Sequence, residues 1–292
     1  MLHVLVMTDS NSGMSKEEAA KYGVVVLPMS FIINGKIYYE GVDITHEEFF
    51  EKLAQGAEPF TSQPAPGEVI DLWNKYLKKY DEIIYIPMSS GLSKSYETAC
   101  MLAQDYDGKV QVLDSKRISV PQKQLVMDAV ALVKQGMSAK EVREELEKDA
   151  LRFTIYITVD TLKYLKRGGR ITAAAAVFGT MLNVKPVLVV KGEKLDAYEK
   201  VRGMKAGRRA MIAAIRKEIE ENFQEELKND ELCIHMAHSS MNTKEVEEWK
   251  EQIMEAFPNL PLHTDMLTLS LSCHIGPGGL GIAVSKCRNH NW

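Results

Sequence analysis

Short runs of β-branched and aliphatic residues alternate with longer segments of helical pattern, and this alternation constrains the fold more than any other feature. Strands that alternate with helices are typical of βαβ units, in which successive strands run parallel. The sequence therefore predicts an α/β protein built mostly on parallel sheet. Six runs are expected to be strands: Val4–Met7, Ile83–Pro87, Gln111–Leu113, Ile155–Val159, Pro186–Val190 and Leu232–Met236.

The intervening segments carry signals for helix starts and for one tight turn. After Arg208, apolar residues recur every four positions from Met211 to Leu227, which predicts one apolar helix face. Asn34-Gly35, between two β-like runs, predicts a hairpin turn. Four stretches place glutamate three residues after a hydroxyl or amide side chain, the spacing of a capping box: Ser15–Glu18, Thr45–Glu48, Ser138–Glu141 and Asn242–Glu245.

The length of 292 residues accommodates two domains of ordinary size. We expect the boundary after the helical segment Ala139–Leu151, which gives domains at 1–152 and 153–292. A formal net charge of −4 argues against a nucleic-acid binder, because such proteins are usually basic.

The four cysteines are widely spaced and none forms a C-x-x-C pair, so we expect free thiols in a reducing compartment. No cluster of His, Cys, Asp and Glu has a usable metal-ligand spacing, and no metal is expected.

The best membrane candidate, Ile171–Val190, has an uncharged part shorter than the roughly 20 residues that a spanning helix needs. The N-terminus lacks the features of a signal peptide. We therefore expect a cytoplasmic protein, with at most transient contact with a membrane surface.

Two polar segments carry hydroxyl groups near predicted helix starts. Phe60–Glu68 places Thr61 and Ser62 before a proline-rich helix entry, where they either cap the helix or offer donors to an anion. Met88–Tyr96, which contains Ser93, follows a predicted parallel strand and opens a helix. The carboxyl ends of such strands bind ligands, and helix N-termini favour anions. An ordinary serine-rich turn is the alternative.

Two further segments are rich in glycine. In Leu165–Ile171, Arg170 either forks onto a carboxylate or pairs with a neighbouring acid. In Cys273–Ile282, Gly276, Gly278 and Gly281 fit G-x-G-x-x-G. A dinucleotide site is not favoured, because Pro277 and a β-like tail fit a helix entry poorly. His274 in this segment is either structural or functional.

In this order, the four segments resemble the DegV family, whose members include the fatty-acid-binding subunit of bacterial fatty acid kinase. The resemblance covers essentially the whole chain and extends to three further motifs: Thr8-Asp9-Ser10, Asp114-Ser115 and Leu182–Pro186. It implies a DegV-type fold with two domains, an N-terminal mostly parallel sheet flanked by helices and a C-terminal α/β domain that holds a lipid tunnel. It also implies that the protein binds one long-chain, palmitate-like fatty acid with no other cofactor. The chain would not be an enzyme itself but would present the acid to an ATP-dependent kinase for acyl-phosphate formation.

Carried over by this resemblance, Thr61 and Ser93 would donate to the fatty-acid carboxylate, which would sit between the domains. Ser62, Arg170, His274, Gly276 and Gly278 would support the head group. Lys94-Ser95 stands where the family usually has Gly-Thr, which leaves the ligand preference open. The tunnel candidates are Val177, Phe178, Met181, Leu182, Met266 and Leu269, with Leu267 and Leu271 as further contributors; all could equally be ordinary core.

A basic stretch offers a candidate partner surface. Arg202 and Lys205, within Lys200–Arg209, are either a solvated helix entrance or a docking site for an acidic kinase surface.

Two other interpretations of the chain remain open at this point. One is a hydrolase or transferase that uses Ser93 with His274, oriented by an acid such as Asp9. The other is a sensor that responds to lipid occupancy.

Overall fold

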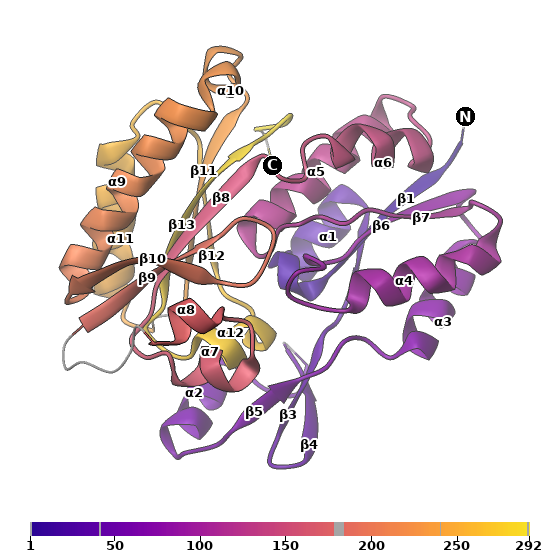
Figure 1. Ribbon diagram of the computed structural model, residues 1–292. Helices are drawn as coiled ribbons and strands as arrows, with labels where there is room; N and C mark the ends of the chain where they lie inside the picture. The colour runs from indigo at the N-terminus through magenta and orange to yellow at the C-terminus, as the bar shows by residue number, and fades with distance from the viewer. Residues whose placement is uncertain (1, 41, 178–183, 240, 291) are drawn as a thin grey trace.

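The computed structural model describes residues 2–40, 42–177, 184–239, 241–290 and 292, and arranges them around three sheets (Figure 1). The N-terminal sheet has the order β2-β1-β6-β7, and all its strand pairs are parallel, as predicted. Its strands are β1 (Val4–Asp9), β2 (Val24–Leu27), β6 (Glu82–Ile86) and β7 (Val110–Val112).

Helices cover both faces of this sheet because its strands are apolar on both sides. Side chains of α1, α5 and α6 pack with Val4, Val6 and Ile84, whereas α3 and α4 pack with Leu5 and Met7 on the other face. These helices are α1 (Lys16–Tyr22), α3 (Pro66–Tyr76), α4 (Ser95–Ala103), α5 (Val120–Lys134) and α6 (Ala139–Glu147).

The second sheet has six strands in the order β10-β9-β8-β13-β11-β12. Only β11 and β12 run parallel, so the prediction of parallel sheet is wrong for this half. The last strand of the chain, β13, inserts antiparallel between β8 and β11, a pairing that local alternation cannot reveal. The strands are β8 (Phe153–Thr158), β9 (Val184–Val190), β10 (Asp196–Arg202), β11 (Leu232–His238), β12 (Leu262–Met266) and β13 (Leu280–Lys286).

Two long helices, α9 (Met204–Asn222) and α11 (Thr243–Ala256), cover one face of this sheet. The predicted apolar face of α9 is present, since Met211, Ile215 and Ile219 are buried. It does not extend to Leu227, which is 40% exposed because α9 ends at Asn222 and α10 (Gln224–Lys228) follows.

A third, small sheet, β4-β3-β5, joins the two larger parts. The predicted hairpin lies between β3 (Ser30–Ile33) and β4 (Lys36–Tyr39), with Asn34 and Gly35 at φ of 50° and 79°. With β5 (Pro59–Thr61) and α2 (His46–Ala54), this sheet packs onto α7 (Lys163–Gly168) and α12 (Leu269–Ile275). An N-terminal segment thus shares a core with the C-terminal half, and the division at residue 152 stays a prediction.

Three of the four expected capping boxes form completely, at Ser15, Thr45 and Ser138. The fourth is half formed, since Asn242 accepts from the Glu245 N–H. Among the described residues, the remaining helices are short: α8 (Ala173–Ala176) and the 3-10 turns η1 (Ser10–Ser12) and η2 (Gln104–Tyr106).

Two of the four cysteines differ from the expectation of free thiols. Cys233 on β11 and Cys287, just after β13, form a disulfide with a Cα–Cα distance of 6.2 Å. Their sequence separation of 54 residues hides the pairing, which the antiparallel register of β11 and β13 creates. Cys100 and Cys273 are free, as expected.

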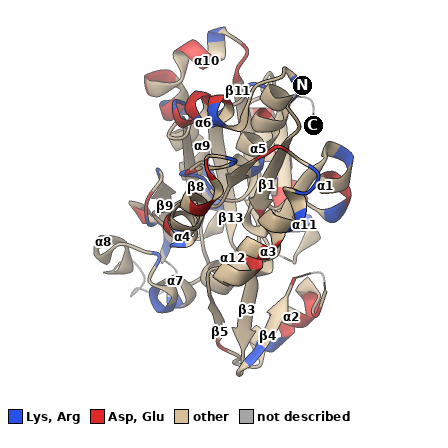
Figure 2. Cartoon of the chain, turned by 90° about the vertical axis from the view of Figure 1, so that its right-hand side faces the viewer, with Lys and Arg blue, Asp and Glu red and all other residues tan. Residues whose placement is uncertain are grey.

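The outer surface is charged, and none of the helices within the described ranges is long and apolar enough to cross a membrane. Figure 2 shows acidic and basic side chains spread over outer helices such as α1, α2 and α10.

Candidate functional site

A cavity lies between the N-terminal loops and the face of the second sheet that α9 and α11 leave uncovered. The empty space inside it is about 1000 Å³, part of which is open to solvent. Most of its lining is apolar. We call six buried lining residues the apolar interior: Leu92, Ile157, Val190, Leu195, Leu271 and Ile275. We call four of the predicted lining residues with hydrogen-bonding side chains the polar end: Thr61, Ser93, Arg170 and His274.

The loop after β6 carries Ser93 to the cavity and is anchored to the second half of the chain. The Ser89 hydroxyl donates to the Gly192 carbonyl over 2.7 Å. Gly91 is required at this contact, because a Cβ there would lie 2.4 Å from the same carbonyl oxygen. The loop ends where α4 begins, so Ser93 lies beside a helix N-terminus, whose partial positive charge favours an anion.

The hydrogen bonds around Ser93 leave its own hydrogen available to a ligand when Ser95 is the donor of the hydroxyl pair. Its Oγ lies 2.7 Å from the Ser95 Oγ and accepts from the Ser95 backbone N–H over 3.2 Å. When the Ser95 hydroxyl also donates to Ser93, the Ser93 hydroxyl is free to donate into the cavity.

Thr61, at the end of β5, meets His274 of α12, with 2.8 Å between Oγ1 and Nε2. Burial, with smaller effects from Arg170 and Arg167, lowers the pKa of His274 to about 4, so its ring is neutral near pH 7. Its Nδ1 is buried without a partner and faces the backbone of Gly168, where a Cβ would lie 2.0 Å away.

These contacts assign the tautomer of His274. A proton on Nδ1 would be buried without an acceptor, whereas a proton on Nε2 is donated to Thr61. With this tautomer, Thr61 accepts from His274 and keeps its own hydroxyl hydrogen for a ligand.

Arg170 joins the two sides of the polar end. Its Nε donates to the Leu92 carbonyl over 3.1 Å and its Nη1 to the Gly168 carbonyl over 2.6 Å. These partners are carbonyls, so the predicted pairing with a neighbouring acid does not appear in these bonds. The guanidinium charge lies on the cavity wall, where it favours an anionic group.

Of the other three predicted head-group residues, only one lines the cavity. Ser62 lines the cavity beside Thr61. Gly276 and Gly278 do not, and the structure corrects this expectation: the Gly276 N–H is bonded to the Ser272 carbonyl, and both glycines have positive φ in the turn after α12. A Cβ on Gly276 would lie 2.3 Å from the Tyr164 ring, so this glycine serves close packing.

The predicted tunnel residues fall elsewhere or outside the described residues. Val177 is 64% exposed, and Leu269 packs with Phe31 and Phe49 in the core of the small sheet. Met266 ends β12 and does not line the cavity. Phe178, Met181 and Leu182 lie outside the described residues.

The lining from this region instead follows one face of α12. The further contributors Leu267 and Leu271 do line the cavity, together with Ser270, His274 and Ile275. Their spacing is that of a helix face, and Leu269 and Cys273 lie on the other side. Recognition of Leu269–Ile275 as a helix would have selected these positions.

Sequence reasoning missed several polar lining residues. Asn11 follows the Thr8-Asp9-Ser10 motif and accepts from the Ser270 hydroxyl, and both side chains line the cavity. His235 on β11 also lines it, with only 1% of its surface exposed. The sequence offers one signal that His235 is unusual, namely its position within an otherwise apolar predicted strand.

The three side chains of the alternative enzyme site, Ser93, His274 and Asp9, form hydrogen bonds with other residues. Asp9 is fully buried, and burial raises its pKa to about 6. Its carboxylate accepts from the Met88 N–H and from Gln122 rather than from His274. His274 bonds Thr61, and Ser93 bonds Ser95, so these hydrogen bonds form no Ser93–His274–Asp9 chain.

The predicted docking residues Arg202 and Lys205 are exposed at the junction of β10 and α9. Arg208, in the same basic stretch, is instead buried and pairs with Glu245 and Glu248 of α11, each at 3.6 Å. Because Arg208 is buried, the exposed basic surface is smaller than the stretch Lys200–Arg209 suggests.

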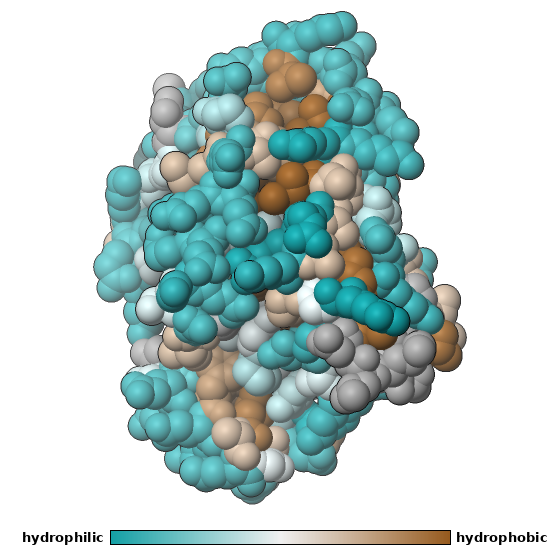
Figure 3. Space-filling view, turned by 90° about the vertical axis from the view of Figure 1, so that its left-hand side faces the viewer, coloured by the Kyte–Doolittle hydropathy of each residue, from teal (hydrophilic) through white to brown (hydrophobic). Residues whose placement is uncertain are grey.

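On the face where α9 and α11 lie, Figure 3 shows apolar side chains in narrow strips between hydrophilic ones.

Together these features define a class: α/β proteins with an apolar cavity between two sheets and hydroxyl groups at one end of it. Residues 3–286 match the family described as "Uncharacterised protein, DegV family". A DegV domain-containing protein of Staphylococcus aureus strain N315 is 32% identical over 287 residues, which cover 98% of this chain and 100% of the relative. The chain therefore belongs to the DegV family.

Two solved structures of the family have similar folds. A DegV family protein from Thermus thermophilus, described as binding fatty acid, has a TM-score of 0.87 and 29% identity. DegV of Bacillus subtilis, described as a fatty acid binding protein, has a TM-score of 0.83 and 26% identity. Each comparison covers 98% of this chain and 100% of the other.

Proposed function

We propose that this protein binds one long-chain fatty acid, with the carboxylate at the polar end and the acyl chain in the apolar interior. The observation that carries the proposal is a single cavity that joins the hydroxyls of Thr61 and Ser93 to an extended apolar lining. The fatty-acid binding described for the Thermus thermophilus and Bacillus subtilis relatives supports it.

The acyl chain supplies most of the binding free energy. Each buried methylene contributes roughly 0.8 kcal/mol, so about 15 methylenes supply on the order of 12 kcal/mol. Part of this offsets the lost freedom of the ligand. A cavity with this lining therefore selects a ligand with a long apolar tail.

The carboxylate requires partners, because a buried charge without hydrogen bonds is very costly. Thr61 and Ser93 each keep a hydroxyl hydrogen for one carboxylate oxygen. Arg170 and the N-terminus of α4 add positive potential without covering the head group. His274 is neutral and acts by holding the Thr61 hydroxyl in its donating orientation.

The chain then acts as a carrier that presents the head group to an ATP-dependent kinase. That kinase would transfer a phosphoryl group from ATP to the carboxylate and form an acyl phosphate. Arg202 and Lys205 are the residues proposed to meet an acidic surface of the kinase, since both are exposed and basic.

Extraction of the natively purified protein with organic solvent, followed by mass spectrometry, tests the proposal. One fatty acid per chain is expected. Protein that is purified empty, takes up no added fatty acid and hydrolyses esters would instead favour the enzyme built on Ser93 and His274. A Ser93→Ala protein in the ester assay separates hydrolysis at this site from a contaminant.

A further inference from the structure

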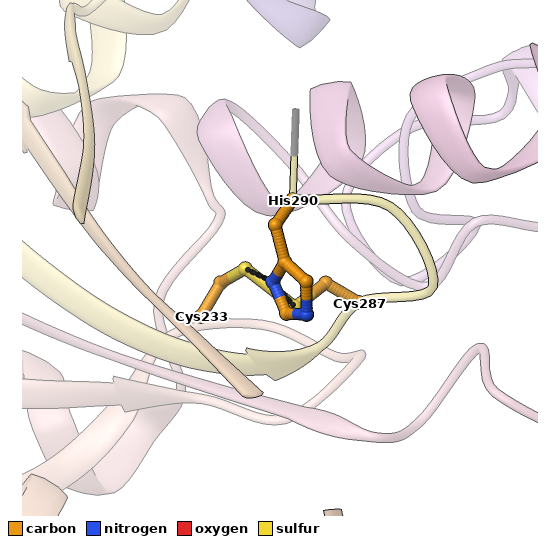
Figure 4. A group of neighbouring side chains, drawn as sticks. All are labelled: Cys233, Cys287 and His290. Atoms are coloured by element: carbon orange, nitrogen blue, oxygen red, sulfur yellow. Dashed lines mark hydrogen bonds between the residues drawn. A yellow bond between two sulfur atoms is a disulfide. The ribbon is translucent and has the colours of Figure 1, made fainter. Parts of the chain in front are cut away.

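Cys233, Cys287 and His290 gather outside the cavity lining, at the end of the second sheet nearest the C-terminus (Figure 4). One potential ligand atom from each residue lies within 4.8 Å of the others. The His290 Nδ1 points at both sulfurs, 3.4 Å from Cys233 Sγ and 3.3 Å from Cys287 Sγ. Both cysteines are fully buried, whereas His290 is half-buried.

The other nitrogen of the His290 ring fixes its tautomer. Nε2 contacts the backbone carbonyl oxygen of Asp230, which can only accept, so Nε2 carries the proton. Nδ1 is then unprotonated, and its lone pair faces the two sulfurs. Metal-binding histidines commonly show this arrangement, in which the far ring nitrogen donates to a carbonyl and the near one binds the ion.

In the disulfide form this lone pair receives no hydrogen bond from the two sulfurs, because a disulfide sulfur carries no hydrogen. In the reduced form the same three atoms are two thiol sulfurs, which bind a metal ion as thiolates, and an imidazole nitrogen. This donor set matches the preferences of Zn²⁺, which binds cysteine sulfur and histidine nitrogen in tetrahedral sites.

The backbone that carries the ligands is anchored independently of the sulfur–sulfur bond. The Cys287 N–H donates to the Glu231 carbonyl over 2.9 Å, and the Arg288 N–H donates to the Asp128 carboxylate over 2.9 Å. The Asn289 carbonyl accepts from Gln124 over 2.9 Å. Reduction therefore leaves the segment before His290 tied to β11 and α5.

We propose that the reduced protein binds a thiophilic divalent cation of the Zn²⁺ class through Cys233 Sγ, Cys287 Sγ and His290 Nδ1. Sequence spacing does not reveal this group, because Cys233 lies far from Cys287-x-x-His290 in sequence and the β11–β13 register brings them together.

The chemistry balances in two steps. A dithiol reductant supplies two electrons and two protons, so the Cys233–Cys287 bond breaks into two thiols and the reductant becomes a disulfide. The cation then displaces both thiol protons and forms two metal–sulfur bonds, while His290 contributes its lone pair and releases no proton. The disulfide and the metal site are thus alternative states of the same residues.

The test uses the full chain, reduced with a phosphine and freed of reductant under argon. Zn²⁺ is titrated against a chromophoric chelator, and Co²⁺ is added separately as a spectroscopic probe. We expect one Zn²⁺ per chain and a sulfur-to-cobalt charge-transfer band for the reduced wild type, and neither for the oxidised protein.

Matched variants identify the ligands. Cys287→Ser removes one of the two thiolates and should abolish the sulfur-to-cobalt charge-transfer band that the reduced wild type shows. Cys100→Ser changes the free, half-buried cysteine and should bind Zn²⁺ as wild type does. His290→Ala keeps both buried cysteines and should weaken Zn²⁺ binding at least about 100-fold, the upper end of losses seen for residues that only support a ligand. Equal Zn²⁺ affinity in wild type and His290→Ala, or no Zn²⁺ binding by folded, reduced wild type, would overturn the proposal.

Discussion

The polar end and the apolar interior of the cavity are built in different ways. The polar end takes one residue from each of four places: the end of β5, the loop before α4, the segment after α7, and α12. Four of the six interior residues lie on regular elements: Ile157 on β8, Val190 on β9, and Leu271 and Ile275 on one face of α12. The polar end therefore depends on the joint placement of separate segments, whereas the interior depends on periodicity within a few elements.

This difference separates two tasks in the proposed function. Burial of methylenes is non-directional and grows with chain length, so the interior sets affinity. Hydrogen bonds contribute less each but have fixed directions, so the polar end sets the position of the carboxylate. Variants at the two ends should therefore differ in kind as well as in size.

The largest effect is expected from blocking the interior. Ala237 on β11 lines the cavity, and Ala237→Phe would displace about five methylenes of the acyl chain. At roughly 0.8 kcal/mol each, this costs about 4 kcal/mol, or about a 1000-fold loss of affinity for a sixteen-carbon acid. Competition with a fluorescent fatty acid measures it.

Ala173→Phe, at an exposed position of α8, makes the same substitution away from the cavity and should leave affinity unchanged. A shorter acid should suffer less from Ala237→Phe than a long one. Unchanged affinity for the long acid would mean that the acyl chain does not pass β11.

Burial of His274 at the polar end makes the stability of the folded protein depend on pH. The folded-state pKa of His274, about 4, lies below the usual 6.5, so the unfolded chain binds the proton first as the pH falls. The stabilisation from the neutral ring is full above about pH 6.5 and is lost as the pH falls towards 4. It amounts to about 3 kcal/mol.

His274→Gln keeps a donor for Thr61 but does not titrate. Urea unfolding of lipid-free protein at pH 7 and pH 4.5 should show the stability of wild type falling relative to this variant at the lower pH. The same comparison with Leu271→Met, in the interior, should show no dependence on pH. A constant difference between wild type and His274→Gln would mean that the ring is not buried in its neutral form.

The same contrast explains what the sequence alone could predict. Capping boxes, the Asn34-Gly35 hairpin and the parallel N-terminal sheet follow from local spacing, and all three are present. The insertion of β13 between β8 and β11 and the Cys233–Cys287 pairing depend on long-range register, which local pattern does not encode.

At the site, the four residues that motif order selected, Thr61, Ser93, Arg170 and His274, line one cavity, and their roles stay a proposal. The interior was harder to predict, because an apolar residue looks alike in a cavity wall and in a packed core. Leu271 and Leu269 are only two residues apart, yet the turn of α12 sends one to the cavity and the other to Phe31 and Phe49.

A single hydroxyl at the polar end should matter less than a blocked interior. Ser93→Ala removes one hydrogen bond to a carboxylate, worth about 1.5–3 kcal/mol, so affinity should fall at least about tenfold. Lipid occupancy after purification and titration with fatty acid both report it. Ser90→Ala, which removes a hydroxyl from the same loop away from the cavity lining, is the control. Wild-type occupancy in Ser93→Ala would remove Ser93 from the proposed site.

The smallest effect is expected outside the cavity, at the proposed kinase surface. Arg202→Glu should leave lipid affinity unchanged, because Arg202 is exposed and does not line the cavity. With a fatty acid kinase supplied in trans, kcat/KM for acyl-phosphate formation should fall up to about fivefold, as exposed ion pairs are worth at most about 1 kcal/mol. The difference should shrink as salt screens the charges. Lys78→Glu makes the same type of charge reversal at an exposed site in the N-terminal half. If both variants slow the kinase equally, net charge rather than docking at Arg202 explains the effect.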